Sequence, residues 1–251
     1  MTRSYRLSIL FFLLPLTFAI EPSGLNLNVP GGLAKKELVF SLQHRFYGKI
    51  NDHPLDNAFG IDQGANAGLA LRYRVWAGLE LAGSYTRQEK EYGLAAGYAF
   101  AFPRILRCEA AVNYFDYKKT TVPERRRNFF YQALFQSEPV LKKILVNLTT
   151  GYDGYHERFG LGFGLDVGTD INIGPIEGVH LVAEYFPVID PDTASTQPCN
   201  SFAVGFKART YGHNFMFAVG NNTEIGSRRL MLGASANDLY LAVNIQRFLK
   251  L

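Results

Sequence analysis

The chain has 251 residues and a formal net charge of +4, which is too small for its length to indicate a nucleic-acid-binding surface. A mean hydropathy of −0.04 excludes a bundle of membrane-spanning helices. The 24 glycines and the 14% of aromatic residues are typical of β structure with aromatic girdles. The two cysteines, Cys108 and Cys199, are too few for a disulfide scaffold or a cysteine-rich zinc site.

Residues 1–19 have the three regions of a secretory signal peptide. Arg3 and Arg6 give a positive start, 7–18 is apolar, and Thr17-Phe18-Ala19 places small residues at the −3 and −1 positions. The apolar run is shorter than the roughly 20 residues that a spanning helix needs. We therefore expect a cleaved signal peptide (1–19), a polar N-terminal arm outside the barrel (20–36) and a single β-barrel domain (37–251).

Thirteen segments after the arm alternate large apolar residues with small or polar ones, which is the two-residue period of a β-strand. They cover 37–49, 65–75, 79–87, 92–102, 106–117, 129–136, 144–152, 158–168, 179–186, 202–210, 215–219, 230–234 and 239–248. Single-chain bacterial barrels have even strand numbers, so one assignment must be wrong. Either a segment near Phe129 or Phe215 is split incorrectly, or the arm contributes a strand. We predict 12 strands, with 14 as the alternative.

The clearest segment is 158–168, with the sequence RFGLGFGLDVG. One face carries Phe159, Phe163 and three other large apolar residues, and the opposite face carries glycine and charge. A soluble sheet would bury the large residues in a core. A membrane barrel turns them toward lipid and turns the small or polar ones toward its lumen. This segment alone fits both arrangements.

Two features of the whole chain favour the membrane barrel. Short turns near Trp76, Pro103, 137–143, 173–177, Gly212 and 237–238 alternate with longer loops that begin at Ile50, Lys118, Pro187 and Asn221. Short turns on one rim and long loops on the other are the outer-membrane arrangement. A soluble sandwich would instead have to bury all of these apolar faces in one core with no helix to cover them. The sequence therefore predicts an all-β, transmembrane, antiparallel up-and-down barrel in the bacterial outer membrane.

The polar face of nearly every segment carries charge or amide groups. We predict that the lumen-facing residues are Arg45, Arg72, Arg74, Glu80, Arg107, Glu109, Asn113, Asp166, His180, Glu184, Lys207 and Arg209. Long charged side chains would narrow the lumen of a 12-stranded barrel. Charged rings set selectivity in such a pore, and the excess of arginine favours anions.

Several motifs resemble a family of uncharacterised bacterial outer-membrane β-barrel proteins, found especially in Bacteroidetes-type bacteria. They are LVFSLQHRFYG in the first segment, FGIDQGANAGL after it, VAEYF, YGHNFMFAVGNNT and the closing AVNIQRF. The resemblance covers the chain from Glu37 onward. It implies an outer-membrane barrel and supplies no catalytic residues, because the family has no settled activity.

Candidate chemistry is sparse. His180 and Glu184 share one strand face and would form a general-base pair, but no serine has a defined relation to them, so a hydrated histidine in a charged wall is preferred. Asp52, His53 and Asp56 lack the spacing of a metal site. The run 125–127 is three arginines that would contact anionic lipopolysaccharide or form a solvated loop. We predict no catalytic residue, no metal and no cofactor.

The function that follows is a non-enzymatic outer-membrane barrel with a charged lumen, either a narrow porin-like channel or a structural and docking protein. The expected partners are outer-membrane lipid and lipopolysaccharide, the barrel-assembly machinery, and a small polar or anionic solute; nucleic acid is not expected. Two alternatives stay open: an outer-membrane barrel enzyme that acts on lipid, and a soluble secreted β-barrel binding protein.

Overall fold

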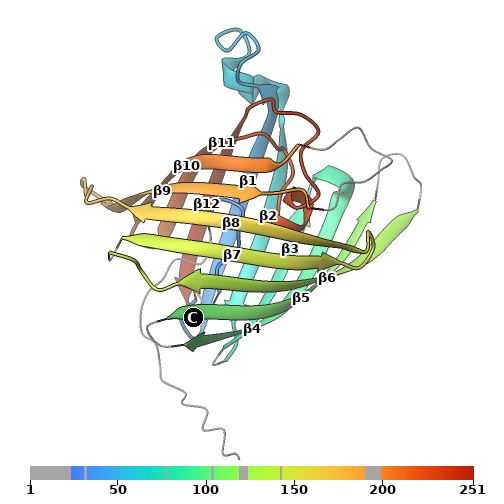
Figure 1. Cartoon of the computed structure of the whole chain (residues 1–251). Helices are drawn as coiled ribbons and strands as arrows, with labels where there is room; N and C mark the ends of the chain where they lie inside the picture. The colour runs from blue at the N-terminus through green and yellow to red at the C-terminus, as the bar shows by residue number, and fades with distance from the viewer. Residues whose placement is uncertain are drawn as a thin grey trace, which may run out of the picture.

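The computed structural model describes residues 24–30, 33–76, 78–102, 105–118, 124–141, 143–189 and 199–251. The signal peptide predicted at 1–19 lies outside these residues. Twelve antiparallel strands close into one barrel in chain order, with β1 paired to β12 (Figure 1). This confirms the predicted fold and its strand number. Closure gives every strand two partners, so the wall has no free edge.

The strands have the following bounds: β1 Glu37–Lys49, β2 Ala65–Arg74, β3 Leu79–Thr86, β4 Glu91–Phe102, β5 Leu106–Lys118, β6 Arg125–Ser137, β7 Ile144–Asp153, β8 Arg158–Gly168, β9 Ile176–Phe186, β10 Ser201–Thr210, β11 His213–Gly220 and β12 Tyr240–Lys250. Three short helices, η1 (Ala58–Gln63), η2 (Gln88–Lys90) and α1 (Ser227–Leu230), lie between them. None of the described helices has the length and apolar character needed to span a bilayer.

The wall of the barrel is apolar outside and small or polar inside. In β8, Phe159 and Phe163 are 65% and 44% exposed, whereas Asp166 is 4% exposed and Gly160, Gly162 and Gly164 are buried. The same alternation runs through β4, whose exposed positions include Tyr92, Leu94, Tyr98 and Phe100. Large apolar residues on the outer face and glycine or charge on the inner face are the reverse of a soluble β-barrel.

The thirteenth predicted strand does not exist. Leu230 ends α1, and Met231 and Ala234 follow it, buried among other residues. Phe129 and Phe215, the positions suspected of being split incorrectly, lie within the true strands β6 and β11. The apolar run 230–234 looked like a strand because burial inside the barrel selects the same residue types as contact with lipid. The arginines 125–127 also differ from expectation, since they begin β6 and do not form a loop.

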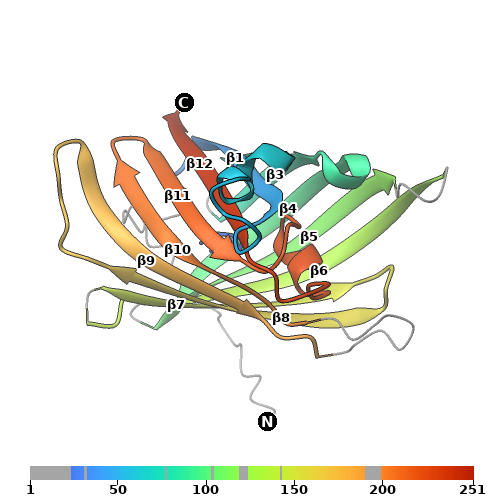
Figure 2. The same cartoon turned by 90° about the horizontal axis from the view of Figure 1, so that it is seen from above.

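The two rims of the barrel differ. One carries the short connections between β2 and β3, β4 and β5, β6 and β7, β8 and β9, and β10 and β11, together with the start of β1 and the end of β12. The other carries the longer loops after β1, β5, β9 and β11, and also the short connections 87–90 after β3 and 154–157 after β7. The 221–239 segment between β11 and β12 turns inward, so that α1 lies inside the ring of strands (Figure 2). We call this segment the inserted loop.

Candidate functional site

The N-terminal arm (described at 24–30 and 33–36) is inside the barrel. Leu25 and Leu27 are each 1% exposed, and Val29 and Leu33 are buried equally deeply. Leu25 packs in a cluster with Val182, Ala203, Met216, Ala218 and Ala242. Leu27 packs with Phe130, Phe186, Leu230 and Met231, so it also contacts the inserted loop. The expectation that the arm lies outside the barrel is therefore wrong: its leucines find an apolar surface in the lumen that they would lack outside.

The glycines on the inner face of β8 make room for these inserts. A Cβ atom on Gly164 would lie 2.9 Å from a methyl carbon of Leu27, and one on Gly162 would lie 2.8 Å from the Phe186 ring. A Cβ on Gly160 would lie 2.6 Å from the Cβ of Met231. Real side chains do not approach so closely. The three glycines therefore leave spaces, here called sockets, that side chains of the arm and the inserted loop fill.

Polar contacts hold the arm in register. The Glu184 carboxylate accepts hydrogen bonds from the backbone N–H groups of Asn26 (2.9 Å) and Leu27 (3.0 Å) and from the Asn26 side chain (2.9 Å). Arg45 donates to Asn26 Oδ1 (2.6 Å), and Asn244 donates to the Leu25 carbonyl (2.6 Å). Hydrogen bonds to a buried charged group are among the stronger ones in proteins. Glu184, Arg45 and Asn244 thus recognise the arm backbone as a binding site recognises a peptide.

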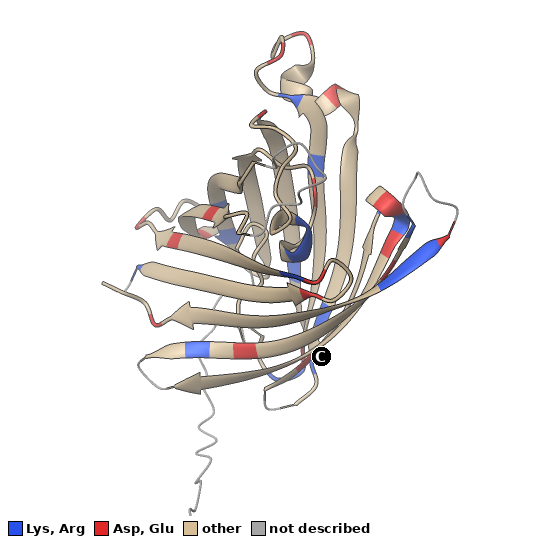
Figure 3. Cartoon of the chain, turned by 45° about the vertical axis from the view of Figure 1, so that its right-hand side comes forward, with Lys and Arg blue, Asp and Glu red and all other residues tan. Residues whose placement is uncertain are grey.

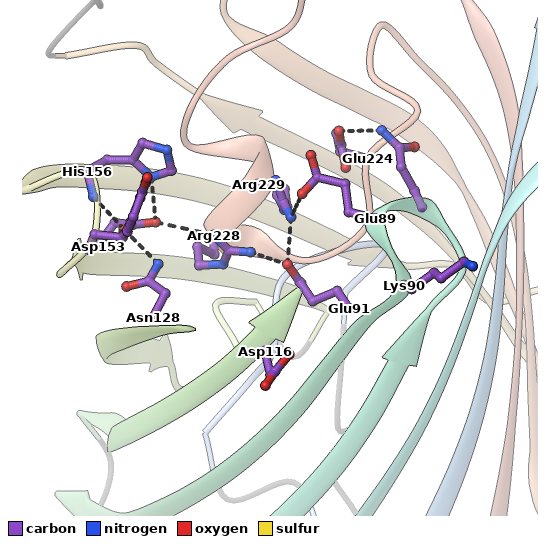
Figure 4. Close-up of polar contacts among 12 residues, drawn as sticks. Glu89, Lys90, Glu91, Asp116, Asn128, Asp153, His156, Glu224, Arg228 and Arg229 are labelled. Carbon is purple, nitrogen blue, oxygen red and sulfur yellow. Dashed lines mark hydrogen bonds and ion pairs between the residues drawn. The ribbon is translucent and has the colours of Figure 1, made fainter. Parts of the chain in front are cut away.

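The inserted loop is anchored by two arginines on α1 (Figure 4). Arg228 forms ion pairs with Glu91 and, at 3.4 Å, with Asp153; its side chain is 3% exposed. Arg229 pairs with Glu89 and, at 2.6 Å, with Glu91. These contacts join the loop to the start of β4 and the end of β7. We call the Arg228, Arg229, Glu89, Glu91 and Asp153 cluster the latch.

Aromatic rings complete the latch. The Arg228 guanidinium lies 4.5 Å from the Phe115 ring centre, and the Arg229 guanidinium lies 5.0 Å from that of Tyr117. Ser227 accepts a hydrogen bond from Gln132 at 2.9 Å. A guanidinium can satisfy carboxylates with its edge and a ring with its face at the same time. The geometry holds the inserted loop across the lumen and against the wall.

Glu224 is a partly buried carboxyl on the inserted loop. Burial raises the pKa of Glu224, and this effect outweighs the attraction of Arg229, which lowers it. The ionised form is therefore disfavoured in the folded state, so stability increases as pH falls through the raised pKa and is lost as pH rises above it.

We expect Glu224→Gln to increase stability at neutral pH, because it removes the buried charge and keeps an acceptor for the Gln88 side chain, which donates to Glu224 at 2.6 Å. The gain should disappear as the pH is lowered through the raised pKa of the wild-type carboxyl. Chemical unfolding at several pH values measures it. Asp62→Asn on the exposed surface of η1 is the control. A gain that does not vary with pH would contradict the argument.

The predicted lumen residues lie on the inner rows of the wall, in separate groups. Arg72 contacts Glu80 at 2.5 Å and Glu109 at 3.7 Å. Asp166 contacts His180 at 2.6 Å and Lys207 at 2.5 Å. The hypothesis that His180 and Glu184 act as a pair is wrong, because His180 binds Asp166 and Glu184 binds the arm.

The other predicted residues have individual contacts. Arg74 donates to the carbonyl of Leu33 in the arm. Arg107 lies 3.7 Å from Glu138, and Asn113 donates to the Phe130 carbonyl at 3.2 Å. Arg209 follows Lys207 on the same row of β10. Sequence reasoning missed the arm and the latch. The available signal was the alternation Leu25-Asn26-Leu27-Asn28-Val29, which is too regular for a solvated arm.

The lumen is filled unevenly. Leu25 and Leu27 of the arm pack against β8 to β12 and Phe130 of β6, whereas a cavity of about 160 Å³ remains between the arm, the inserted loop and strands β2 to β6. Six charged residues line this cavity: Arg72, Glu80, Glu91, Glu109, Arg228 and Arg229. The amides Asn113 and Gln132 and the rings Phe115 and Phe130 also line it. Such a mixture of polar groups and aromatic rings is typical of small-molecule sites.

Residues 143–246 match the family described as "Membrane bound beta barrel domain (DUF5777)". The chain is a membrane-bound β-barrel. With the closed 12-stranded wall, this places it in the bacterial outer membrane and confirms the resemblance to an uncharacterised barrel family over residues 143–246. The soluble secreted alternative is wrong, because the rows exposed around the outside of this membrane barrel are large and apolar.

Solved structures of other barrels are similar to this chain. A KdgM porin in complex with disordered oligogalacturonate is 13% identical, with a TM-score of 0.50 over 83% of this chain and 98% of that chain. A second KdgM porin structure is 10% identical (TM-score 0.48; 84% and 98% covered). LpxR from Salmonella typhimurium is 11% identical (TM-score 0.42; 85% and 100% covered). At 13% identity, the likeness to the first of these structures extends to the fold alone. No curated protein matches the chain in sequence.

A charge on the outer face of this membrane barrel should disrupt its folding. We expect Phe163→Arg, in the middle of β8, to reduce the free energy of unfolding in lipid vesicles by about 2–4 kcal/mol, because the arginine would be placed in hydrocarbon. Leu55→Arg, at a position 84% exposed in the loop after β1, is the matched control and should change little. Equal losses in the two variants would contradict a lipid-facing β8.

Proposed function

We propose that this barrel is a non-enzymatic outer-membrane channel for small polar or anionic solutes, kept narrow by the arm and the inserted loop. The observation that carries the proposal is the unfilled cavity against β2 to β6. Its volume of about 160 Å³ corresponds to roughly five water molecules. In a barrel with only a structural role, we would expect the whole lumen to be packed, with no polar cavity left beside the arm.

The likeness to a porin supports the channel proposal at the level of the fold. One of those porins is described in complex with oligogalacturonate, an anionic carbohydrate. In this chain the inner charges are tied to one another or to the arm, as in the Arg72–Glu80 pair and the Asp166–His180–Lys207 group. The Asp166–His180 pair is also bound to Lys207 inside the lumen, and the Asp153–His156 pair is bound to Arg228 of the latch. Both pairs therefore belong to ion-pair networks, which favours a non-enzymatic role.

Single-channel recording tests the proposal. Protein refolded in detergent and added to a planar bilayer in molar potassium chloride should produce infrequent, small current steps, because only the cavity side of the lumen can carry ions. Heat-denatured protein is the control. If neither the intact protein nor a variant without the arm gives steps above that control, the channel proposal is wrong.

We propose that the start of β6, at the rim with the longer loops, binds phosphorylated lipid. This strand begins with three arginines (Figure 3). Arg127 is largely exposed and shares its row with Phe129 and Tyr131, and Arg125 lies over the Tyr92 ring. Cations just beyond an aromatic girdle are at the depth of lipid headgroups. Assembly by the barrel-assembly machinery is expected from the outer-membrane location alone.

A further inference from the structure

We propose that the cavity against β2 to β6 selects neutral, hydroxyl-rich solutes of about the size of one sugar ring, in preference to anions. The proposal rests on the proposed channel function and names the solute class for it. It differs from the anion preference expected from the excess of arginine in the sequence. The reason is where the charges lie, which the strand pattern alone does not show.

The charges that line the cavity are balanced. Arg72, Arg228 and Arg229 face Glu80, Glu91 and Glu109, so three positive groups meet three negative ones. Other cations inside the barrel do not line the cavity. Arg45 donates a hydrogen bond to the arm, and Lys207 is paired with Asp166. An ion that enters a confined site must lose water, and only a net opposite charge can compensate that loss. A cavity with balanced charges offers no such compensation.

The cationic groups are also occupied. Arg72 contacts both Glu80 and Glu109, and the two latch arginines share Glu91. An anion would have to displace a buried carboxylate from each guanidinium and leave that carboxylate without its partner. A neutral hydroxyl needs no such exchange, because it can donate and accept hydrogen bonds beside an intact ion pair.

The remaining lining fits the same class of solute. Ser84 and Thr86 supply hydroxyls, and Asn113 and Gln132 supply amides. Phe115 and Phe130 supply aromatic rings, against which the C–H faces of a sugar can pack. The volume of about 160 Å³ is that of a small solute and not of a long oligosaccharide.

Uptake into vesicles tests the inference. Full-length barrel is reconstituted in vesicles of zwitterionic lipid, and the entry of radiolabelled glucose and glucuronate is compared with that into protein-free vesicles. The two probes have the same ring and differ by one carboxylate. We expect glucose to enter at least about threefold faster, since the carboxylate alone must be desolvated without compensation.

The double variant Glu80→Gln/Glu109→Gln leaves three cations against one carboxylate in the lining, so it should reduce or reverse the preference for glucose. Glu177→Gln, exposed at the start of β9, is the matched control and should keep it. β-Sheet circular dichroism checks that each variant folds. The wild-type comparison tests the inference even if the double variant does not fold.

The outcomes separate the two proposals. If neither probe enters faster than in protein-free vesicles, the channel function itself is wrong. If both enter and glucuronate is as fast as glucose or faster, the channel function stands and the neutral-solute inference is overturned. An unchanged preference in the folded double variant would overturn charge balance as its cause.

Discussion

Removing the arm from the lumen is expected to increase the single-channel conductance of the barrel by on the order of threefold, because the lumen of a 12-stranded barrel is wide enough to conduct once it is not filled. The change is a deletion of residues 24–33. The arm packs against β8 to β12 through Leu25 and Leu27, so its loss opens that half of the lumen to water. Planar-bilayer recording gives the conductance directly.

Without shortening the chain, two substitutions test whether the arm restricts the lumen. Glu184→Ala removes the carboxylate that binds the arm backbone, and Gly164→Leu fills the socket that Leu27 occupies. Both should displace the arm and give larger or more frequent steps. Glu177→Ala, on the same strand as Glu184 but exposed, is the control. Conductance unchanged by the deletion and by both substitutions would show that the arm does not restrict the lumen.

Breaking the latch should have a large effect on stability. Arg228→Met is expected to reduce the free energy of unfolding by about 3 kcal/mol, because the buried Glu91 keeps only Arg229 as a cationic partner within the latch and Asp153 loses its latch arginine. Methionine fills part of the space, so the loss is mainly electrostatic. Urea unfolding in lipid vesicles measures the change. Trypsin should also cleave at Arg229, which the intact latch buries.

An exposed ion pair gives the comparison. Lys143 and Asp170 form a pair whose side chains are 47% and 84% exposed. Lys143→Met should therefore cost less than about 1 kcal/mol, because water already solvates both charges. If Arg228→Met costs no more than Lys143→Met, and trypsin leaves the inserted loop intact in both, the latch does not hold the loop in place.

The wall of the barrel could be predicted because its information is local. Each strand shows on its own which residues share a face, as β8 does with Phe159 and Phe163 against glycine and Asp166. The choice between lipid and core for the apolar face came from the alternation of short turns and long loops, and from the number of apolar faces that a soluble core would have to bury without a helix to cover them. Neither step required knowledge of which residues meet across the barrel.

The contents of the lumen could not be predicted in the same way. The apolar residues of 230–234 and of the arm are buried inside the barrel, and a sequence pattern does not distinguish that burial from contact with lipid. The glycines of β8 indicated a wall with small inner residues, but their role as sockets exists only once Leu27 and Met231 are brought to them. The partners are far apart in the chain, as Glu184 is from Asn26.

The sequence by itself therefore determined a membrane barrel, its outer and inner faces and its two unequal rims, and it limited the strand number to 12 or 14, because alternation and turn residues act over a few neighbouring positions. Only the tertiary structure decided that the arm and the inserted loop enter the lumen, that Glu184 and Arg228 hold them there, and that the charges around the remaining cavity balance. These properties depend on distances across a closed wall, and closure brings together residues that no local pattern relates.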